Sequence, residues 1–140
     1  MPSLLKARNS VETTGDRLIL PVSLLISTVS KNSDEDFDMI YNSVINEGML
    51  NPIIVWSTTV SGWLDWASPS PGITTPPPSL MKNPSKRVKL VKCGNNRLLY
   101  AVTAGYTHID CIVCEDRAET SRLCTKLRKE WNEDRIREES

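Results

Sequence analysis

The chain has 140 residues, of which 39% are hydrophobic and 24% charged, and its formal net charge at pH 7 is zero. This length suits one domain with a hydrophobic core, and the composition excludes an intrinsically disordered chain. No apolar run approaches the ~20 residues that span a bilayer, and the first residues lack the features of a secretory signal. We therefore expect a cytoplasmic protein without a membrane partner, whose four cysteines are reduced thiols.

The N-terminal part of the chain gives weak signals before a clear helix. Residues 1–16 carry no periodicity, and we expect a flexible N-terminal arm ahead of a single domain over residues 17–140. Residues 18–21, Leu-Ile-Leu-Pro, predict a short first strand. Residues 37–45 then place apolar side chains at i, i+3, i+4, i+7 and i+8, which predicts a helix that stops at Gly48.

A hydrophobic strand precedes an unusual proline-rich segment. Residues 53–56, Ile-Ile-Val-Trp, lack polar alternation and predict a strand buried on both faces. Residues 57–85 hold six of the nine prolines, with Trp63 and Trp66 near the start, and show no period. We expect a proline-rich inserted loop that folding does not need. It is either a tolerated surface insertion or a lid or docking loop for a protein partner.

Strand and helix signals return after the proline-rich segment. Residues 87–92 alternate as in a strand, and we expect Asn95 or Asn96 to cap a helix that ends at Gly105. Residues 109–113 predict a further strand.

A C-terminal helix is predicted over residues 116–137. Asp116 with Glu119 three residues later favours its start, and its outer face mixes both charges. The apolar stripe that should dock on the core consists of Leu123, Leu127 and Trp131. Strands and helices in this order predict the α/β class, in the broad sense that includes α+β.

The break from strand to helix at Gly94 predicts a phosphate site. Several backbone N–H groups lack intrahelical partners at a helix start, and the helix dipole adds positive charge there. Gly94 lets the backbone approach a ligand, and Arg97 adds a guanidinium fork from the first turn. The predicted site is Gly94, Asn95, Asn96 and Arg97, and an exposed Arg97 should add little to stability. The alternative is a glycine turn beside a surface arginine.

Positive charge is concentrated between residues 67 and 109, where no acidic residue occurs. The six cations of this stretch favour one basic face that contacts a polyanion such as DNA. The candidate contacts are Lys86, Arg87, Lys89 and Lys92.

The cysteines do not suggest a metal site. Cys111 and Cys114 have C-x-x-C spacing, but on a strand positions i and i+3 point to opposite faces. No second Cys or His pair completes a zinc site, so we expect no metal there. Cys93, at the end of an alternating strand, is interpreted as a core residue.

Two ordered blocks of the chain resemble the ParB/sulfiredoxin family. Residues 94–105, which begin Gly-Asn-Asn-Arg-Leu-Leu-Tyr-Ala, are similar to the ParB pattern Gly-Glu-Arg-Arg followed by Leu-x-Ala-Ala. Residues 43–55 are similar to the family's helix end, Gly-Leu-x-Gln-Pro and hydrophobic strand. The resemblance covers roughly residues 18–114 and implies a compact domain with a small mixed sheet and about three helices. In the family the Gly-x-x-Arg turn binds nucleotide phosphates, of CTP in ParB and of ATP in sulfiredoxin.

The match is incomplete inside the turn. Gly94 and Arg97 agree with the family, whereas ParB has Glu-Arg where this chain has Asn95-Asn96. Sulfiredoxin has its catalytic Cys and a His at those two positions, which excludes sulfiredoxin chemistry. Asp110 stands where the family usually has Pro.

The resemblance implies two alternative functions. One is a nucleotide- or DNA-phosphate-binding module with a regulatory role, whose cofactor is a nucleoside triphosphate, CTP or ATP, with or without Mg²⁺. The other is a nucleotide-dependent enzyme, an NTP hydrolase, small-molecule kinase or nuclease, that uses the same turn. The sequence favours the module, because phosphoryl transfer needs metal-holding carboxylates and none lies between Asp65 and Asp110. The 26 residues after Cys114 are too few for the DNA-binding and dimerisation parts of ParB. A short chain with such an insertion suggests a phage or mobile-element protein, which would act in the host cytoplasm.

Overall fold

The computed structural model describes residues 3–9, 11, 13, 15–28, 41–42, 44–45, 48–69 and 72–127. Strands in these ranges are β1 (Leu4–Leu5), β2 (Asp16–Pro21), β3 (Leu25–Ser27), β4 (Ile53–Thr59), β5 (Arg87–Cys93) and β6 (His108–Cys114). Helical elements are η1 (Val22–Leu24), α2 (Val60–Ala67), α3 (Pro78–Met81) and α4 (Asn95–Thr103), and residues 117–127 are also helical. In the same ranges no helix is long and apolar enough to cross a membrane.

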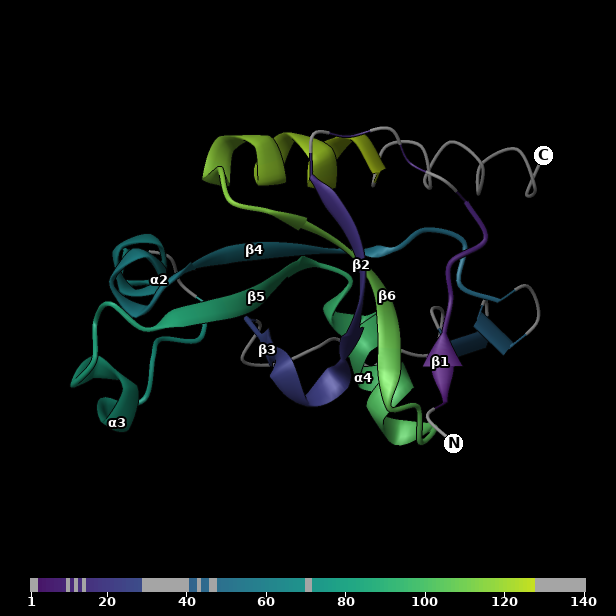
Figure 1. Ribbon diagram of the computed structural model, residues 1–140, viewed down its shortest axis with the longest axis horizontal. Helices are drawn as coiled ribbons and strands as arrows, with labels where there is room; N and C mark the ends of the chain where they lie inside the picture. The colour runs from purple at the N-terminus through teal and green to yellow at the C-terminus, as the bar shows by residue number, and fades with distance from the viewer. Residues whose placement is uncertain are drawn as a thin grey trace.

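The strands form one mixed sheet in the order β1-β6-β4-β5-β3, and β2 also pairs with β6. β6 runs parallel to β1 and β4 and antiparallel to β2. β5 runs antiparallel to β4 and parallel to β3. η1 connects β2 to β3, but β2 pairs with β6 whereas β3 pairs with β5. The sheet therefore curls where η1 joins these two strands (Figure 1). The predicted α/β fold class with a mixed sheet is confirmed.

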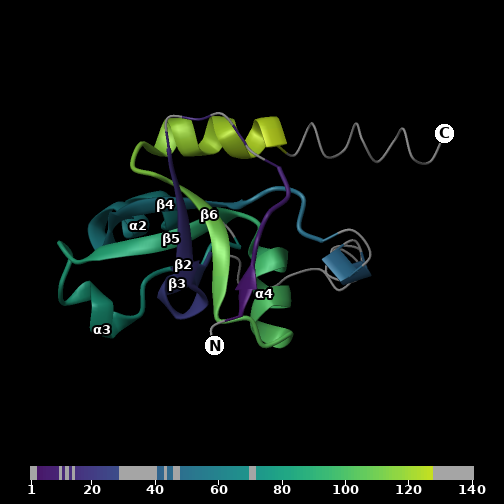
Figure 2. The same cartoon turned by 45° about the vertical axis from the view of Figure 1, so that its right-hand side comes forward.

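Helices cover both faces of the sheet. Residues 117–127 lie above it and α4 lies below it in Figure 1, and the turned view in Figure 2 agrees. The core on the α4 side includes Ile53, Val55, Leu98 and Ala101. The core under the C-terminal helical residues includes Ile54, Ile112, Leu123 and Leu127. Alternate residues of β4 therefore enter both cores, which confirms the predicted strand buried on both faces.

Three of the predicted helix boundaries, at Gly48, Gly105 and Asp116, agree with the structure. Gly48 and Gly105 have φ values of 77° and 86°, the left-handed conformation expected of a helix stop. The Glu119 N–H donates to Asp116 Oδ1 at 3.1 Å, so Asp116 caps the C-terminal helical residues. Most of the helix predicted over residues 37–45, and Trp131 of the C-terminal stripe, lie outside the described residues.

The N-terminal segment is part of the sheet, so the prediction of a flexible arm is wrong for residues 3–9. β1 pairs with the start of β6, and Leu5 and Ala7 are buried in the core on the α4 side. The Arg8 N–H donates to the Met49 carbonyl at 2.8 Å. A strand of two residues is too short to leave a periodic pattern, which is why the sequence did not reveal it.

The first part of the proline-rich segment, up to Ala67, is packed and helical, contrary to the predicted inserted loop, whereas most of the described residues from 68 to 86 are exposed. β4 continues to Thr59, whose Oγ1 accepts a hydrogen bond from the Gly62 N–H at 3.1 Å and caps α2. Val60, Trp63 and Ala67 on one face of α2 are at most 2% exposed. These residues have helical spacing, which the prolines that follow them obscured.

Candidate phosphate site at the start of helix α4

Gly94 makes the turn between β5 and α4. It is the N-cap of α4, with φ 103° and ψ 26°, so the predicted cap at Asn95 or Asn96 is wrong by one or two positions. A Cβ on Gly94 would lie 2.6 Å from Ile53 Cγ2 and 2.8 Å from Arg97 Nη2. Both the left-handed backbone and this close approach require glycine, and they place the Arg97 guanidinium directly beside the turn.

The first turn of α4 presents backbone donors. The Leu98 N–H donates to the Gly94 carbonyl at 2.9 Å and makes the first helical hydrogen bond. The N–H groups of Asn95 and Asn96 come before it, and no acceptor for them is found in the described part of the chain. Together with the dipole of a nine-residue helix, these donors make the turn attractive to an anion.

The Asn95 side chain binds the sheet rather than the open end of the helix. Its Oδ1 accepts hydrogen bonds from Ser27 Oγ at 2.9 Å and from the Thr28 N–H at 3.1 Å. Its Nδ2 donates to the Val91 carbonyl at 3.2 Å. The amide thus links the end of β3 to β5. No sequence pattern could predict this link, because it depends on the register of two distant strands.

Asn96 and Arg97 are half-buried. Asn96 Oδ1 is buried and has no hydrogen-bond partner. Arg97 Nη1 donates to the carbonyls of Asn51 and Pro52 at 2.5 and 3.3 Å, and Nη2 lies 3.8 Å from Cys93 Sγ. The expectation that Arg97 is an exposed side chain with little influence on stability is therefore wrong, because its guanidinium ties α4 to the loop before β4.

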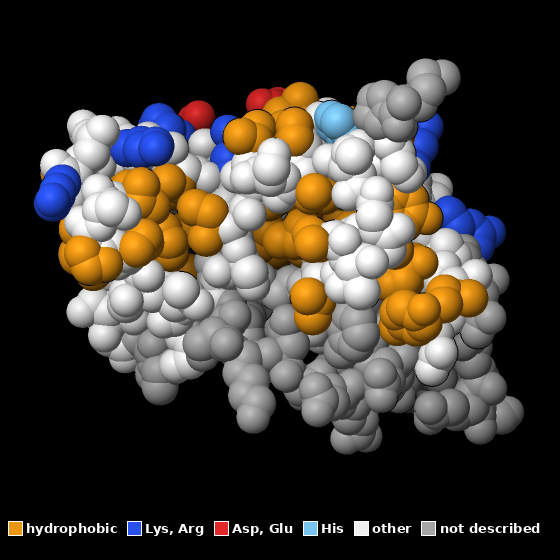
Figure 3. Space-filling view, turned by 90° about the horizontal axis from the view of Figure 1, so that it is seen from below, with side chains coloured by type: hydrophobic (Ala, Val, Ile, Leu, Met, Phe, Trp, Pro, Cys, Tyr) orange, Lys and Arg blue, Asp and Glu red, His pale blue; other side chains and the backbone are white. Residues whose placement is uncertain are grey.

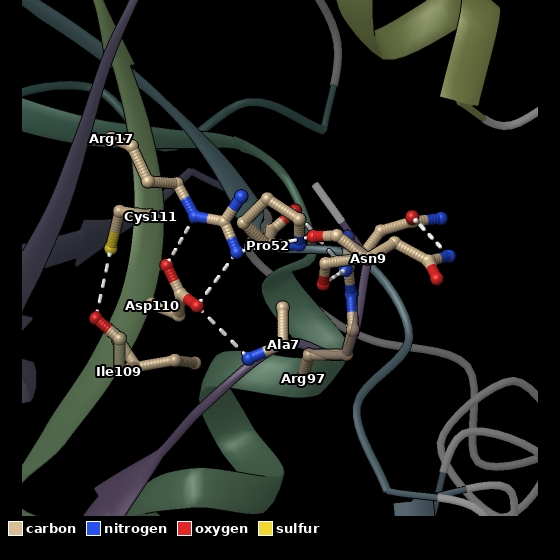
Figure 4. Close-up of polar contacts among 9 residues, drawn as sticks. Ala7, Asn9, Arg17, Pro52, Arg97, Ile109, Asp110 and Cys111 are labelled. Atoms are coloured by element: carbon tan, nitrogen blue, oxygen red, sulfur yellow. Dashed lines mark hydrogen bonds and ion pairs between the residues drawn. The ribbon is translucent and has the colours of Figure 1, made fainter. Parts of the chain in front are cut away.

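An ion pair between a buried carboxylate and a partly exposed arginine lies next to this loop (Figure 4). Asp110 on β6 is 2% exposed, and Arg17 on β2 donates to it through Nε at 2.5 Å and Nη2 at 2.8 Å. The Ala7 N–H adds a hydrogen bond of 3.0 Å. Burial acts to raise the pKa of the Asp110 carboxyl, but the hydrogen bonds from Arg17 and Ala7 outweigh it and the pKa lies below its ordinary value. Both carboxylate oxygens of Asp110 thus accept hydrogen bonds from Arg17, and Oδ2 also accepts from the Ala7 N–H.

The ion pair and the candidate site are connected. Arg17 Nη2 also donates to the Asn9 carbonyl at 3.2 Å, and Asn9 Nδ2 donates to Asn51 Oδ1 at 3.1 Å. The backbone carbonyl of Asn51 in turn accepts a hydrogen bond from Arg97. Figure 4 shows Arg97 beside Asn9 and Pro52. The N-terminal segment therefore helps to hold the loop on which Arg97 rests.

Two of the predicted polyanion contacts, Lys89 and Lys92, lie on opposite sides of the sheet. Lys92 lies over the Trp66 ring, with Nζ 3.8 Å from its centre, on the side of the sheet where Leu90 packs. Lys89 precedes Leu90 and points to the opposite side by strand alternation. Lys86 is exposed, and Arg87 donates to Ser57 Oγ at 3.0 Å. Figure 3 shows Lys and Arg side chains at the margins of the α4 side and hydrophobic and uncharged groups across its centre.

The cysteine side chains are all buried. Cys111 and Cys114 belong to different cores, which confirms that they point to opposite faces of β6. Cys93 is 6% exposed and packs with Ile54, as predicted for a core residue. Burial raises the pKa of Cys111 to about 12. Over the described ranges, no three His, Cys, Asp or Glu side chains are placed to hold a metal ion.

Comparison with solved structures shows a distant likeness to a chromosome-partitioning protein. No protein-family model matches the chain, and no curated protein matches it. The crystal structure of the C-terminally truncated chromosome-partitioning protein ParB from Caulobacter crescentus, complexed with CTP-gamma-S, is similar with a TM-score of 0.45 and 21% sequence identity. The match covers 78% of this chain and 50% of that chain, so the chain spans half the length of that ParB.

Proposed function

We propose that the turn at residues 94–97 binds the phosphates of a nucleotide and that the chain is a nucleotide-binding module. The observation that carries the proposal is the start of α4, where the N–H groups of Asn95 and Asn96 have no acceptor among the described residues. Gly94 has no side chain that would keep a ligand away from these N–H groups, and the Arg97 guanidinium adds positive charge beside the turn. Backbone donors, a helix dipole and a fixed cation together suit a phosphate group.

The class of ligand follows from the sequence of the turn. Its likeness to the Gly-x-x-Arg turn of the ParB/sulfiredoxin family favours a nucleoside triphosphate, and CTP and ATP are the first two to test. DNA phosphates are the other source of the same chemistry. The scattered positions of Lys89 and Lys92 give no continuous track for a DNA strand, so we place the free nucleotide first.

The test is a titration of the ¹⁵N-labelled protein with CTP, ATP and inorganic triphosphate, with and without Mg²⁺, followed by amide chemical shifts. Binding at the proposed site should shift the amide resonances of Asn95 and Asn96 first. A short DNA duplex titrated at low salt distinguishes the two sources of phosphate. Absence of shifts at these two amides with every probe would overturn the proposal. Phosphate release measured in the same samples tests the enzyme alternative.

Two glycines that flank α4 provide a matched pair of variants. Gly94 and Gly105 both have positive φ, but a Cβ on Gly105 would meet no atom within 4 Å. Gly94→Ala and Gly105→Ala should therefore share the cost of a left-handed alanine, about 1–2 kcal/mol. Gly94→Ala should in addition displace Ile53 or Arg97 and reduce phosphate binding. Equal binding by the two variants would place the phosphate elsewhere.

A further inference from the structure

The first turn of α4 is held to the rest of the fold at three points. Gly94 lies against Ile53, and Arg97 binds the Asn51 carbonyl. Asn95 is the third point and the one whose side chain reaches the end of β3. Because Asn95 is the first residue of α4, its anchor fixes the direction in which the neighbouring backbone N–H groups point.

The partner of Asn95 is itself firmly held. Thr28 is 2% exposed, and its Oγ1 donates to the Val91 carbonyl at 2.6 Å. The Thr28 carbonyl accepts a hydrogen bond from the Thr74 N–H at 3.0 Å. The Thr74 carbonyl accepts from Trp63 Nε1 at 2.7 Å. Asn95 is thus bound to Thr28, whose side-chain hydroxyl and backbone carbonyl are both hydrogen-bonded to other parts of the fold.

We propose that Asn95 is a positioning residue for the phosphate site, an inference that rests on the proposed function. Its side-chain amide aims the N–H groups of Asn95 and Asn96 at the ligand and does not contact the phosphate. An amide is needed because Oδ1 accepts from Ser27 and Thr28 while Nδ2 donates to Val91. This assigns to Asn95 a role different from the direct phosphate contact that its place in the turn suggests.

A double-mutant cycle with Ser27 separates positioning from direct contact. The probe is inorganic triphosphate, measured by amide chemical shifts on the full chain. Asn95→Ala should weaken binding about tenfold, because the first turn of α4 loses the hydrogen bonds that orient its N–H groups. Ser27→Ala should weaken binding by a smaller factor, because the Thr28 N–H still holds Oδ1. The double variant should bind no more weakly than Asn95→Ala alone.

Hydrogen exchange tests the anchor on which the positioning role depends. In Asn95→Ala without ligand, the Thr28 amide should exchange faster, because its acceptor is gone. Thr103→Ala, an exposed substitution on the same helix, is the control and should alter neither exchange nor binding.

The outcomes are distinct. Unchanged binding in Asn95→Ala would overturn the positioning role alone. Weaker binding with an unchanged Thr28 exchange rate, or additive effects of Ser27→Ala and Asn95→Ala, would show that the two side chains act separately and would also overturn it. Failure of the parent chain to bind triphosphate would instead refute the phosphate site, and the positioning role with it.

Discussion

Replacing Arg97 by alanine should affect stability and phosphate binding by different amounts. Toward the described residues before β4, the guanidinium donates a short charged hydrogen bond to the Asn51 carbonyl at 2.5 Å and a longer one of 3.3 Å to the Pro52 carbonyl. A hydrogen bond from a charged group contributes about 1.5–3 kcal/mol, and the longer bond adds little, so Arg97→Ala should lower the free energy of unfolding by about 2 kcal/mol. For a chain of this size that corresponds to a Tm roughly 5–8 °C lower.

The binding effect of Arg97→Ala is measured well below the Tm, by titration with CTP and with inorganic triphosphate. Loss of the charge beside Gly94 should weaken binding by about 10- to 100-fold. Arg97→Lys should recover only part of both effects, because an ammonium cannot reproduce the planar fork. Arg122→Ala, which removes a surface arginine paired with Glu119, is the control and should change stability by less than about 1 kcal/mol. An unchanged Tm in Arg97→Ala would refute the structural role, and unchanged affinity would refute the phosphate role.

Three other outcomes are expected from buried side chains. The pKa of Asp110 lies below its ordinary value of about 3.9, so its pair with Arg17 should stabilise the fold fully above that pH and lose its contribution as pH falls through the lowered pKa. Asp110→Asn should therefore flatten the acid side of a Tm series below about pH 4, and an unchanged acid limb would contradict this. Trp63→Ala should cost about 3–5 kcal/mol in urea unfolding, because the indole is 2% exposed, and a loss below about 1 kcal/mol would instead fit the dispensable loop. Cys111, with a thiol pKa of about 12 and no exposed surface, should resist a thiol reagent at pH 8 until the chain unfolds, and rapid labelling of the native protein would show that the strand opens.

Local patterns in the sequence were sufficient for most of the regular structure. The continuous apolar run of residues 53–56 indicates a strand buried on both faces, and β4 supplies both cores. Gly48 and Gly105 mark helix stops because a left-handed residue is most easily glycine. Gly94 and Arg97 also lie together at a helix start, as the turn motif predicts. These features depend on residues close to one another in the chain, whose preferences act before any distant contact forms.

Only the tertiary structure decided how the side chains of the turn are used. Arg97 binds a carbonyl 46 residues away, and Asp110 pairs with Arg17 across 93 residues. Asn95 turns to Thr28 because the parallel pairing of β3 with β5 brings that residue within reach. Such contacts are set by strand register and by which polar groups remain without partners once the core has packed, and composition and periodicity carry no record of either. The sequence alone therefore predicted where a phosphate site could form, whereas only the fold showed which side chains of the turn are bound to the rest of the protein, because those contacts depend on strand register.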